Sequence, residues 1–167
     1  KTVHAGEAYG PESIFQAITE LHAERIGHGY HLFSTELCGA DVKDPESYVQ
    51  KLARYIANRR ITIEVCITSN LQTNPAIKRV EDHVFQRMLK EKLSATLCTD
   101  NRLVSHTTVS REYRLAIDAF KMSENQLRNT IIYGFKRSFY PGPYAHKRAY
   151  VRKIIDYYDQ VMARHTA

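Results

Sequence analysis

Short runs of apolar and β-branched residues alternate with amphipathic stretches along the first two thirds of the chain. The runs predict four short buried strands, at residues 2–4, 25–28, 61–66 and 95–99. Apolar residues then recur at helical spacing in three stretches between the strands, at residues 13–23, 45–56 and 84–89. The pattern therefore predicts a repeated strand-helix unit, typical of an α/β protein with a parallel sheet.

Residues 110–167 have a different pattern, in which helical spacing continues without an intervening strand. Two apolar stripes at helical spacing are formed by Tyr113, Ile117, Phe120, Leu127, Ile131 and Phe135. A Pro-Gly-Pro turn at 141–143 precedes a predicted terminal helix over residues 150–163. We expect one domain over 1–167, with βα units at 1–109 and a helical tail at 110–167 that packs on them.

Polar side chains suited to chemistry follow each of the four predicted strands. They are His4 with Glu7, His28, Ser69 in a polar turn at 68–70, and Asp100 with Asn101. Active sites of parallel α/β folds lie at the carboxyl ends of the strands. A neutral imidazole is a good zinc ligand, and a nearby glutamate can transfer protons. Taken alone, the stretch from His4 to Glu7 is equally consistent with a strand end that carries a solvated glutamate.

Five motifs, in order along the chain, resemble those of the adenosine deaminases, and most of all the bacterial members. They are TVHAGE at 2–7, GPESI at 10–14, AERIGHG at 23–29, EVCITSN at 64–70 and TDN at 99–101. The ordered set is specific, because each motif occupies its own place in the repeated strand-helix pattern. The resemblance covers nearly the whole chain and is strongest before residue 102.

The resemblance implies a (β/α)8 TIM barrel of the metal-dependent hydrolase type, of which this chain covers roughly strands 5–8 and the C-terminal helices. It implies one catalytic Zn²⁺ per complete site, with His4 and Asp100 as two of its ligands. Glu7 matches the glutamate that protonates purine N1. His28 matches the histidine that orients, and can deprotonate, the zinc-bound water. Such an enzyme is cytoplasmic and belongs to purine metabolism.

Three further residues are expected on the substrate side of the site, namely Gly6, Ser69 and Asn101. Most family members carry an aspartate at the position of Asn101, where it bonds purine N7. An asparagine NH2 group can donate to N7 without a protonated acid, so purine binding survives while the choice of substrate stays open. The alternatives are adenosine and deoxyadenosine on one side and another 6-aminopurine, such as adenine, on the other.

The sequence lacks the family's H-x-H pair, which supplies two more zinc ligands from the first strand. The chain also begins, at Lys1, inside a predicted strand. We therefore expect a later part of a longer chain, inactive until the missing N-terminal half of the barrel joins it. The other zinc deaminase design, which carries H-x-E and P-C-x-x-C, does not fit, since Cys38, Cys66 and Cys98 lack that spacing.

Composition limits the other function classes. No apolar run is long enough to span a membrane. The net charge of +6 comes partly from basic pairs at 136–137, 147–148 and 152–153, but their acidic neighbours favour a solvated face over a nucleic-acid surface. An inactive relative that only binds an acidic partner remains the non-enzymatic alternative. Five histidines without a motif around them are expected at the surface or at helix ends: His22, His83, His106, His146 and His165.

Overall fold

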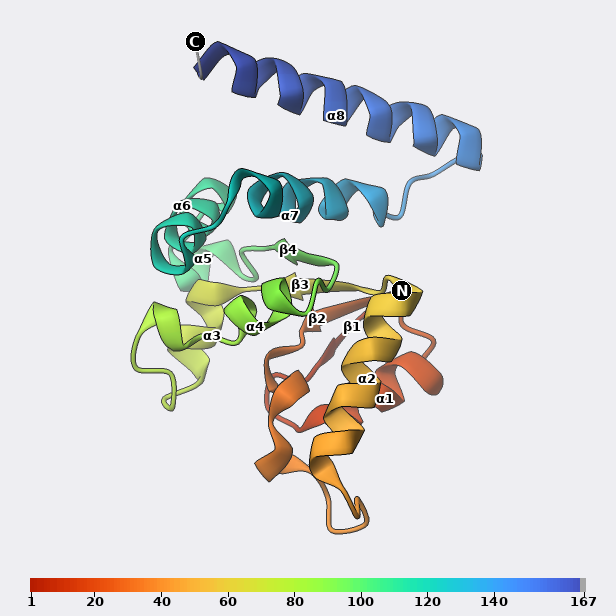
Figure 1. Cartoon of the computed structure of the whole chain (residues 1–167), viewed down its shortest axis with the longest axis vertical. Helices are drawn as coiled ribbons and strands as arrows, with labels where there is room; N and C mark the ends of the chain where they lie inside the picture. Colours follow the sequence, from red (N-terminus) through yellow and green to blue (C-terminus); the bar gives the residue numbers. More distant parts are fainter. Residues whose placement is uncertain (166–167) are drawn as a thin grey trace.

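The four predicted strands form one parallel sheet in the computed structural model, which describes residues 1–165 (Figure 1). The strands lie in the order β1-β2-β3-β4 and span Thr2–Ala5, Arg25–His28, Thr62–Val65 and Ala95–Leu97. Each pairs in parallel with the next one along the chain. Consecutive parallel strands joined by helical crossovers are the arrangement of a (β/α)8 barrel, and the predicted α/β class is confirmed.

The helices that connect the strands begin where the sequence favours a helix start. They are α1 (Pro11–Thr19), α2 (Pro45–Arg59), α3 (Ile67–Thr73) and α4 (Phe85–Lys90), with the 3-10 turns η1 (Tyr30–Phe33), η2 (Thr35–Leu37) and η3 (Val80–Asp82). Proline occupies the first turn of α1 and of α2. The Asp44 side chain caps α2 by accepting from the Ser47 N–H at 3.0 Å.

The hydrophobic core lies between the sheet and these helices. Ile26 and Ile63, on the two central strands, are fully buried against Ile14, Ile56 and Phe85. Burying each such side chain stabilises the fold by about 1.5–3 kcal/mol. Because strands of a parallel sheet are covered on both faces, their residues form continuous apolar runs rather than alternating patterns. The core thus fixes the sheet, and the carboxyl ends of its strands carry the polar residues described below.

The C-terminal tail consists of helices α5 (Arg102–Ser105), α6 (Val109–Phe120), α7 (Glu124–Lys136) and α8 (Tyr144–His165). Helix α7 packs against β4, and α8 lies on the side of α7 away from the sheet (Figure 1). The terminal helix was predicted over residues 150–163. In the structure it begins six residues earlier, at Tyr144, directly after Pro143. A proline is readily accepted immediately before a helix or in its first turn.

The polar turn predicted at residues 68–70 was wrong, because these residues belong to the first turn of α3. The reason is a contact with α6. The Glu112 carboxylate is completely buried, and it accepts hydrogen bonds from the Thr68 N–H, the Thr68 hydroxyl and the Thr107 hydroxyl. It thereby satisfies a free N–H group at the start of α3. A partner 44 residues away overrides the local preference for a turn.

Removing this carboxylate is expected to destabilise the fold. Glu112→Ala leaves the buried Thr107 hydroxyl and the part-buried Thr68 N–H and hydroxyl without this acceptor. We therefore expect the free energy of unfolding to fall by about 3 kcal/mol. Urea denaturation monitored by circular dichroism measures the change. Asp118→Ala is the matched control, since Asp118 is an exposed carboxylate on the same helix. An effect of Glu112→Ala no larger than that of the control would contradict the structural role.

Candidate active site at the strand ends

The residues predicted for the site lie at the carboxyl ends of the four strands. His4 lies in β1, and His28 is the last residue of β2. Ser69 lies in α3, directly after β3, while Asp100 and Asn101 follow β4. The parallel register sets Ala5 of β1 beside His28 of β2. The sheet thus brings side chains that are far apart in sequence to one edge.

His4, Glu7 and His28 form one cluster in which a ligand atom of each lies within 4.8 Å of the others. The His28 Nε2 lies 3.3 Å from the Glu7 Oε2, and the His4 and His28 rings meet edge to face with centroids 4.9 Å apart. His28 is buried, whereas Glu7 is half-buried and His4 exposed. Burial lowers the pKa of His28, and the negative charge of Glu7 opposes this shift. Two imidazoles and a carboxylate so arranged can bind a metal ion or exchange protons with a ligand.

Gly27 makes room for the His4 ring. A Cβ atom at Gly27, which pairs with His4 in the sheet, would lie 2.6 Å from the Cδ2 of the His4 imidazole. Any side chain at this position would therefore displace the ring. The glycine before His28 in the AERIGHG motif thus has a steric reason in the neighbouring strand.

Asp100 lies outside the His4–Glu7–His28 cluster in the part of the chain that the structure describes, and it belongs to a second contact. The buried Ser69 hydroxyl donates to the Asp100 Oδ2 at 2.7 Å. Asp100 has a φ of 54° and His28 a φ of 65°. The left-handed region is costly for residues other than glycine and is often found at functional sites. They are two of the seven non-glycine residues with a positive φ in the part of the chain that the structure describes, and both belong to the motifs.

Gly6 and Asn101 shape the loops of the site. Gly6 lies in the turn between His4 and Glu7, with a φ of 66°, and its N–H donates to the Ser13 hydroxyl at 2.9 Å. The Asn101 Oδ1 caps α5 by accepting from the Leu103 and Val104 N–H groups, each at 3.2 Å. The cap occupies the carbonyl oxygen of Asn101, and the NH2 group is the part suited to a ligand acceptor.

Two residues behind the cluster were not predicted. The Asn70 Nδ2 lies 3.2 Å from the His28 Nδ1, and the His83 Nε2 lies 3.2 Å from the Asn70 Oδ1. His83 is only 2% exposed, so the expected surface position was wrong, although its ring does bond the first N–H of α4. The Tyr30 and His83 rings pack edge to face, with centroids 5.1 Å apart. His22, His106, His146 and His165 are exposed as expected.

The buried His83 predicts a pH dependence of stability. Burial lowers its pKa from 6.5 to about 4. Between pH 6.5 and about pH 4, His83 is therefore protonated in the unfolded chain but neutral in the folded chain. We expect His83 to remove about 3 kcal/mol from the free energy of unfolding as the pH falls through this window. Urea denaturation of wild type and His83→Gln at pH 7 and pH 4 isolates this effect, because glutamine does not titrate. Equal losses in both proteins would contradict it.

Known proteins are similar to this chain along most of its length. A sequence profile of the adenosine deaminase family matches residues 1–157. The chain belongs to the adenosine deaminase family. It is 39% identical over 155 residues to the adenosine deaminase of Salmonella typhimurium, and 41% identical over 138 residues to that of Klebsiella pneumoniae. These matches cover 93% and 83% of this chain, but only 41% and 37% of the relatives.

Solved structures of two deaminases and an amidohydrolase share the fold. The adenine deaminase of Arthrobacter aurescens superposes with a TM-score of 0.75 at 20% identity, over 95% of this chain and 43% of that protein. An amidohydrolase of Burkholderia ambifaria with bound Zn superposes with a TM-score of 0.71 at 22% identity, over 98% of this chain and 42% of that protein. The N6-methyl-AMP deaminase of Arabidopsis thaliana superposes with a TM-score of 0.66 at 27% identity, over 93% of this chain and 40% of that protein. The chain thus covers part of an amidohydrolase TIM barrel.

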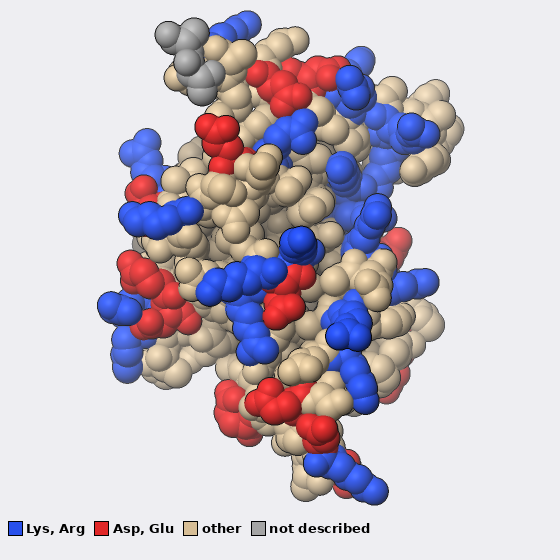
Figure 2. Space-filling model, in the orientation of Figure 1, with Lys and Arg blue, Asp and Glu red and all other residues tan. Residues whose placement is uncertain are grey.

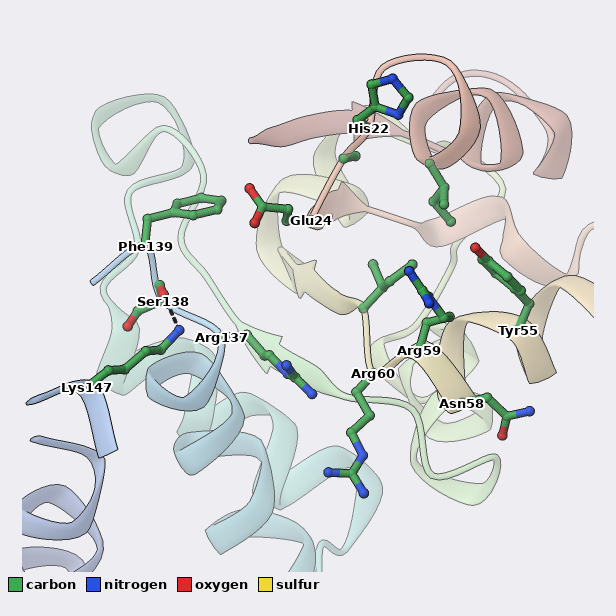
Figure 3. Close-up of a pocket in the computed structure, with 13 residues that line it drawn as sticks. His22, Glu24, Tyr55, Asn58, Arg59, Arg60, Arg137, Ser138, Phe139 and Lys147 are labelled. Atoms are coloured by element: carbon green, nitrogen blue, oxygen red, sulfur yellow. Dashed lines mark hydrogen bonds between the residues drawn. The ribbon is translucent and has the colours of Figure 1, made fainter. Parts of the chain in front are cut away.

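A basic cleft of about 600 Å³ lies at the opposite, amino ends of the strands (Figure 3). Arg59, Arg60, Arg137 and Lys147 line it, and Glu24 lies among them. Lys147 donates to the Ser138 carbonyl at 2.8 Å. Acidic side chains also lie among the basic ones on the face shown in Figure 2. None of the helices within residues 1–165 has both the length and the apolar character needed to cross a bilayer.

Proposed function

We propose that this chain supplies the C-terminal half of an adenosine deaminase, which hydrolyses adenosine and deoxyadenosine to the inosine nucleosides and ammonia. The observation that carries the proposal is the His4–Glu7–His28 cluster at the strand ends of a deaminase-family chain. On this proposal the protein is a cytoplasmic enzyme of purine salvage.

The donor set fits a zinc ion. His4 and Asp100 would hold it, since an imidazole nitrogen and a carboxylate oxygen are zinc ligands. Ser69 keeps the Asp100 carboxylate oriented through its hydrogen bond of 2.7 Å. When bound, zinc lowers the pKa of water to about 7 and so provides the nucleophile at neutral pH.

The remaining residues act on the purine. N1 must gain a proton when addition at C6 breaks the aromatic ring, and the half-buried Glu7 is placed to give it. His28, beside Glu7, orients the attacking water. The Asn101 NH2 group donates to N7, and the Gly6 turn lines the pocket next to Glu7. Ammonia then leaves from C6.

The rest of the barrel completes the site. Strands β1 and β4 are the two edges of an open sheet, and open edges need a covering partner. The relatives are more than twice as long as the matched region. We therefore propose that residues 1–109 pair with four more βα units, which add the other zinc ligands, while residues 110–165 pack outside the barrel.

Ammonia release from a panel of adenosine, deoxyadenosine, adenine, AMP and N6-methyl-AMP tests this function in the complete protein. Adenosine and deoxyadenosine are expected to be the best substrates. A preference for adenine or a nucleotide would favour the second candidate, a related 6-aminopurine deaminase, which Asn101 keeps open. No reaction with any of them would overturn the assignment and favour a binding module.

A further inference from the structure

A chain of hydrogen bonds runs from the backbone of α4 to the buried face of His28. The Phe85 N–H donates to the His83 Nδ1 at 3.0 Å, and the His83 Nε2 lies 3.2 Å from the Asn70 Oδ1. The Asn70 Nδ2 then lies 3.2 Å from the His28 Nδ1. The three side chains are at most 2% exposed. Water therefore does not compete for these bonds.

The hydrogen bond from the Phe85 N–H fixes the direction of the other hydrogen bonds in this series. A backbone N–H can only donate, so the His83 Nδ1 accepts and the ring proton of neutral His83 lies on Nε2. That proton is donated to the Asn70 oxygen, which orients the Asn70 amide so that its NH2 group faces His28. The His28 Nδ1 must then accept. Reversing any one bond would set two donors or two acceptors against each other in a buried position, which is costly.

The consequence for His28 is a single tautomer. With Nδ1 accepting from Asn70, the ring proton lies on Nε2, the nitrogen that faces Glu7 at 3.3 Å. The partner of one ring nitrogen sets the protonation of the other. His28 thus presents an N–H group, rather than a lone pair, to Glu7 and to a ligand beside it.

We propose that Asn70 and His83 are positioning residues that hold His28 in its Nε2–H tautomer and fix the plane of its ring. The proposal rests on the proposed function for its catalytic consequence but not for its structural content. It assigns His28 the task of orienting the attacking water by donation, and it makes His28 unsuited to remove a proton from that water.

Nitrogen-15 NMR of histidine-labelled complete protein tests the tautomer directly, because the spectrum distinguishes a protonated ring nitrogen from a bare one. The wild type is expected to show His28 with the proton on Nε2. Asn70→Asp keeps the size of the side chain but replaces the donor with an acceptor. It is expected to move the proton to Nδ1 and to lower kcat by about 100-fold or more with little change in KM.

The His83 variants give an independent test if Asn70→Asp does not fold. His83→Leu frees the Asn70 amide to rotate, so we expect both tautomers of His28 and a lower kcat. His83→Gln keeps an N–H donor for Asn70 and should restore the single tautomer and the rate. Asn58→Asp makes the same chemical change at an exposed position near the basic cleft (Figure 3) and should alter neither readout.

A wild-type spectrum with the His28 proton on Nδ1 would overturn the proposal. So would a shifted tautomer with an unchanged kcat, in Asn70→Asp or, if that variant is unfolded, in His83→Leu. If the wild type shows the expected tautomer but deaminates no purine, the proposed function fails while the assignment of Asn70 and His83 stands.

Discussion

Glu7→Gln in the complete protein is expected to lower kcat for adenosine deamination by about 100- to 10,000-fold, with little change in KM. Glutamine keeps the size of the side chain and its contact with His28 but cannot transfer a proton. Purine N1 would then gain negative charge without a proton donor when addition begins at C6. Because the missing step is a proton transfer, the loss should appear in kcat rather than in substrate binding.

The position of Glu7 supports this effect. It follows the Gly6 turn, and its Oε2 lies 3.3 Å from the His28 Nε2. A proton donor in this place remains close to a ligand held against the strand ends. Steady-state kinetics with adenosine measure the loss, and Glu20→Gln, an exposed carboxylate at the end of α1, is the control. A Glu7→Gln enzyme with more than a tenth of the wild-type kcat would rule out the proposed proton transfer.

His4→Ala is expected to weaken zinc binding to the complete protein by more than about 100-fold, since even the groups that only orient metal ligands contribute 10- to 100-fold. The His4 ring lies against Gly27, and its ligand atom lies within 4.8 Å of those of Glu7 and His28. Alanine removes the imidazole nitrogen that we propose as a zinc ligand. Deamination should fall together with the zinc content.

Zinc per protein after dialysis against a chelator measures this loss. His22→Ala is the matched control, because His22 is an exposed histidine outside the cluster. Retention of one zinc ion per complete protein by His4→Ala would remove His4 from the ligand set. Loss of zinc in both variants would point instead to general destabilisation of the sheet.

The sheet and its polar rim were predictable because their signals are local. Runs such as the one over residues 61–66 are β-branched and apolar, and parallel strands are buried on both faces. Once the strands are located, the parallel arrangement itself brings His4, Glu7 and His28 to one edge. The contact between Ser69 and Asp100 follows from the same arrangement.

The features that were missed depend on partners far away in the sequence. Helix α3 replaces a predicted turn because Glu112, on α6, bonds Thr68. His83 was expected at the surface or at a helix end because no motif surrounds it, and nothing local shows that it contacts Tyr30 and Asn70. Interactions across 44 and 53 residues leave no periodic pattern to detect.

Ammonia release from adenosine by a completed barrel tests the central claim most directly. This chain can be joined to the N-terminal part of the Salmonella typhimurium adenosine deaminase, a relative to which it is 39% identical over 155 residues. We predict that the joined, folded, zinc-loaded protein releases ammonia from adenosine, that Glu7→Gln abolishes most of this activity, and that the 167-residue chain alone releases none. A folded and zinc-loaded barrel that releases no ammonia would contradict the account.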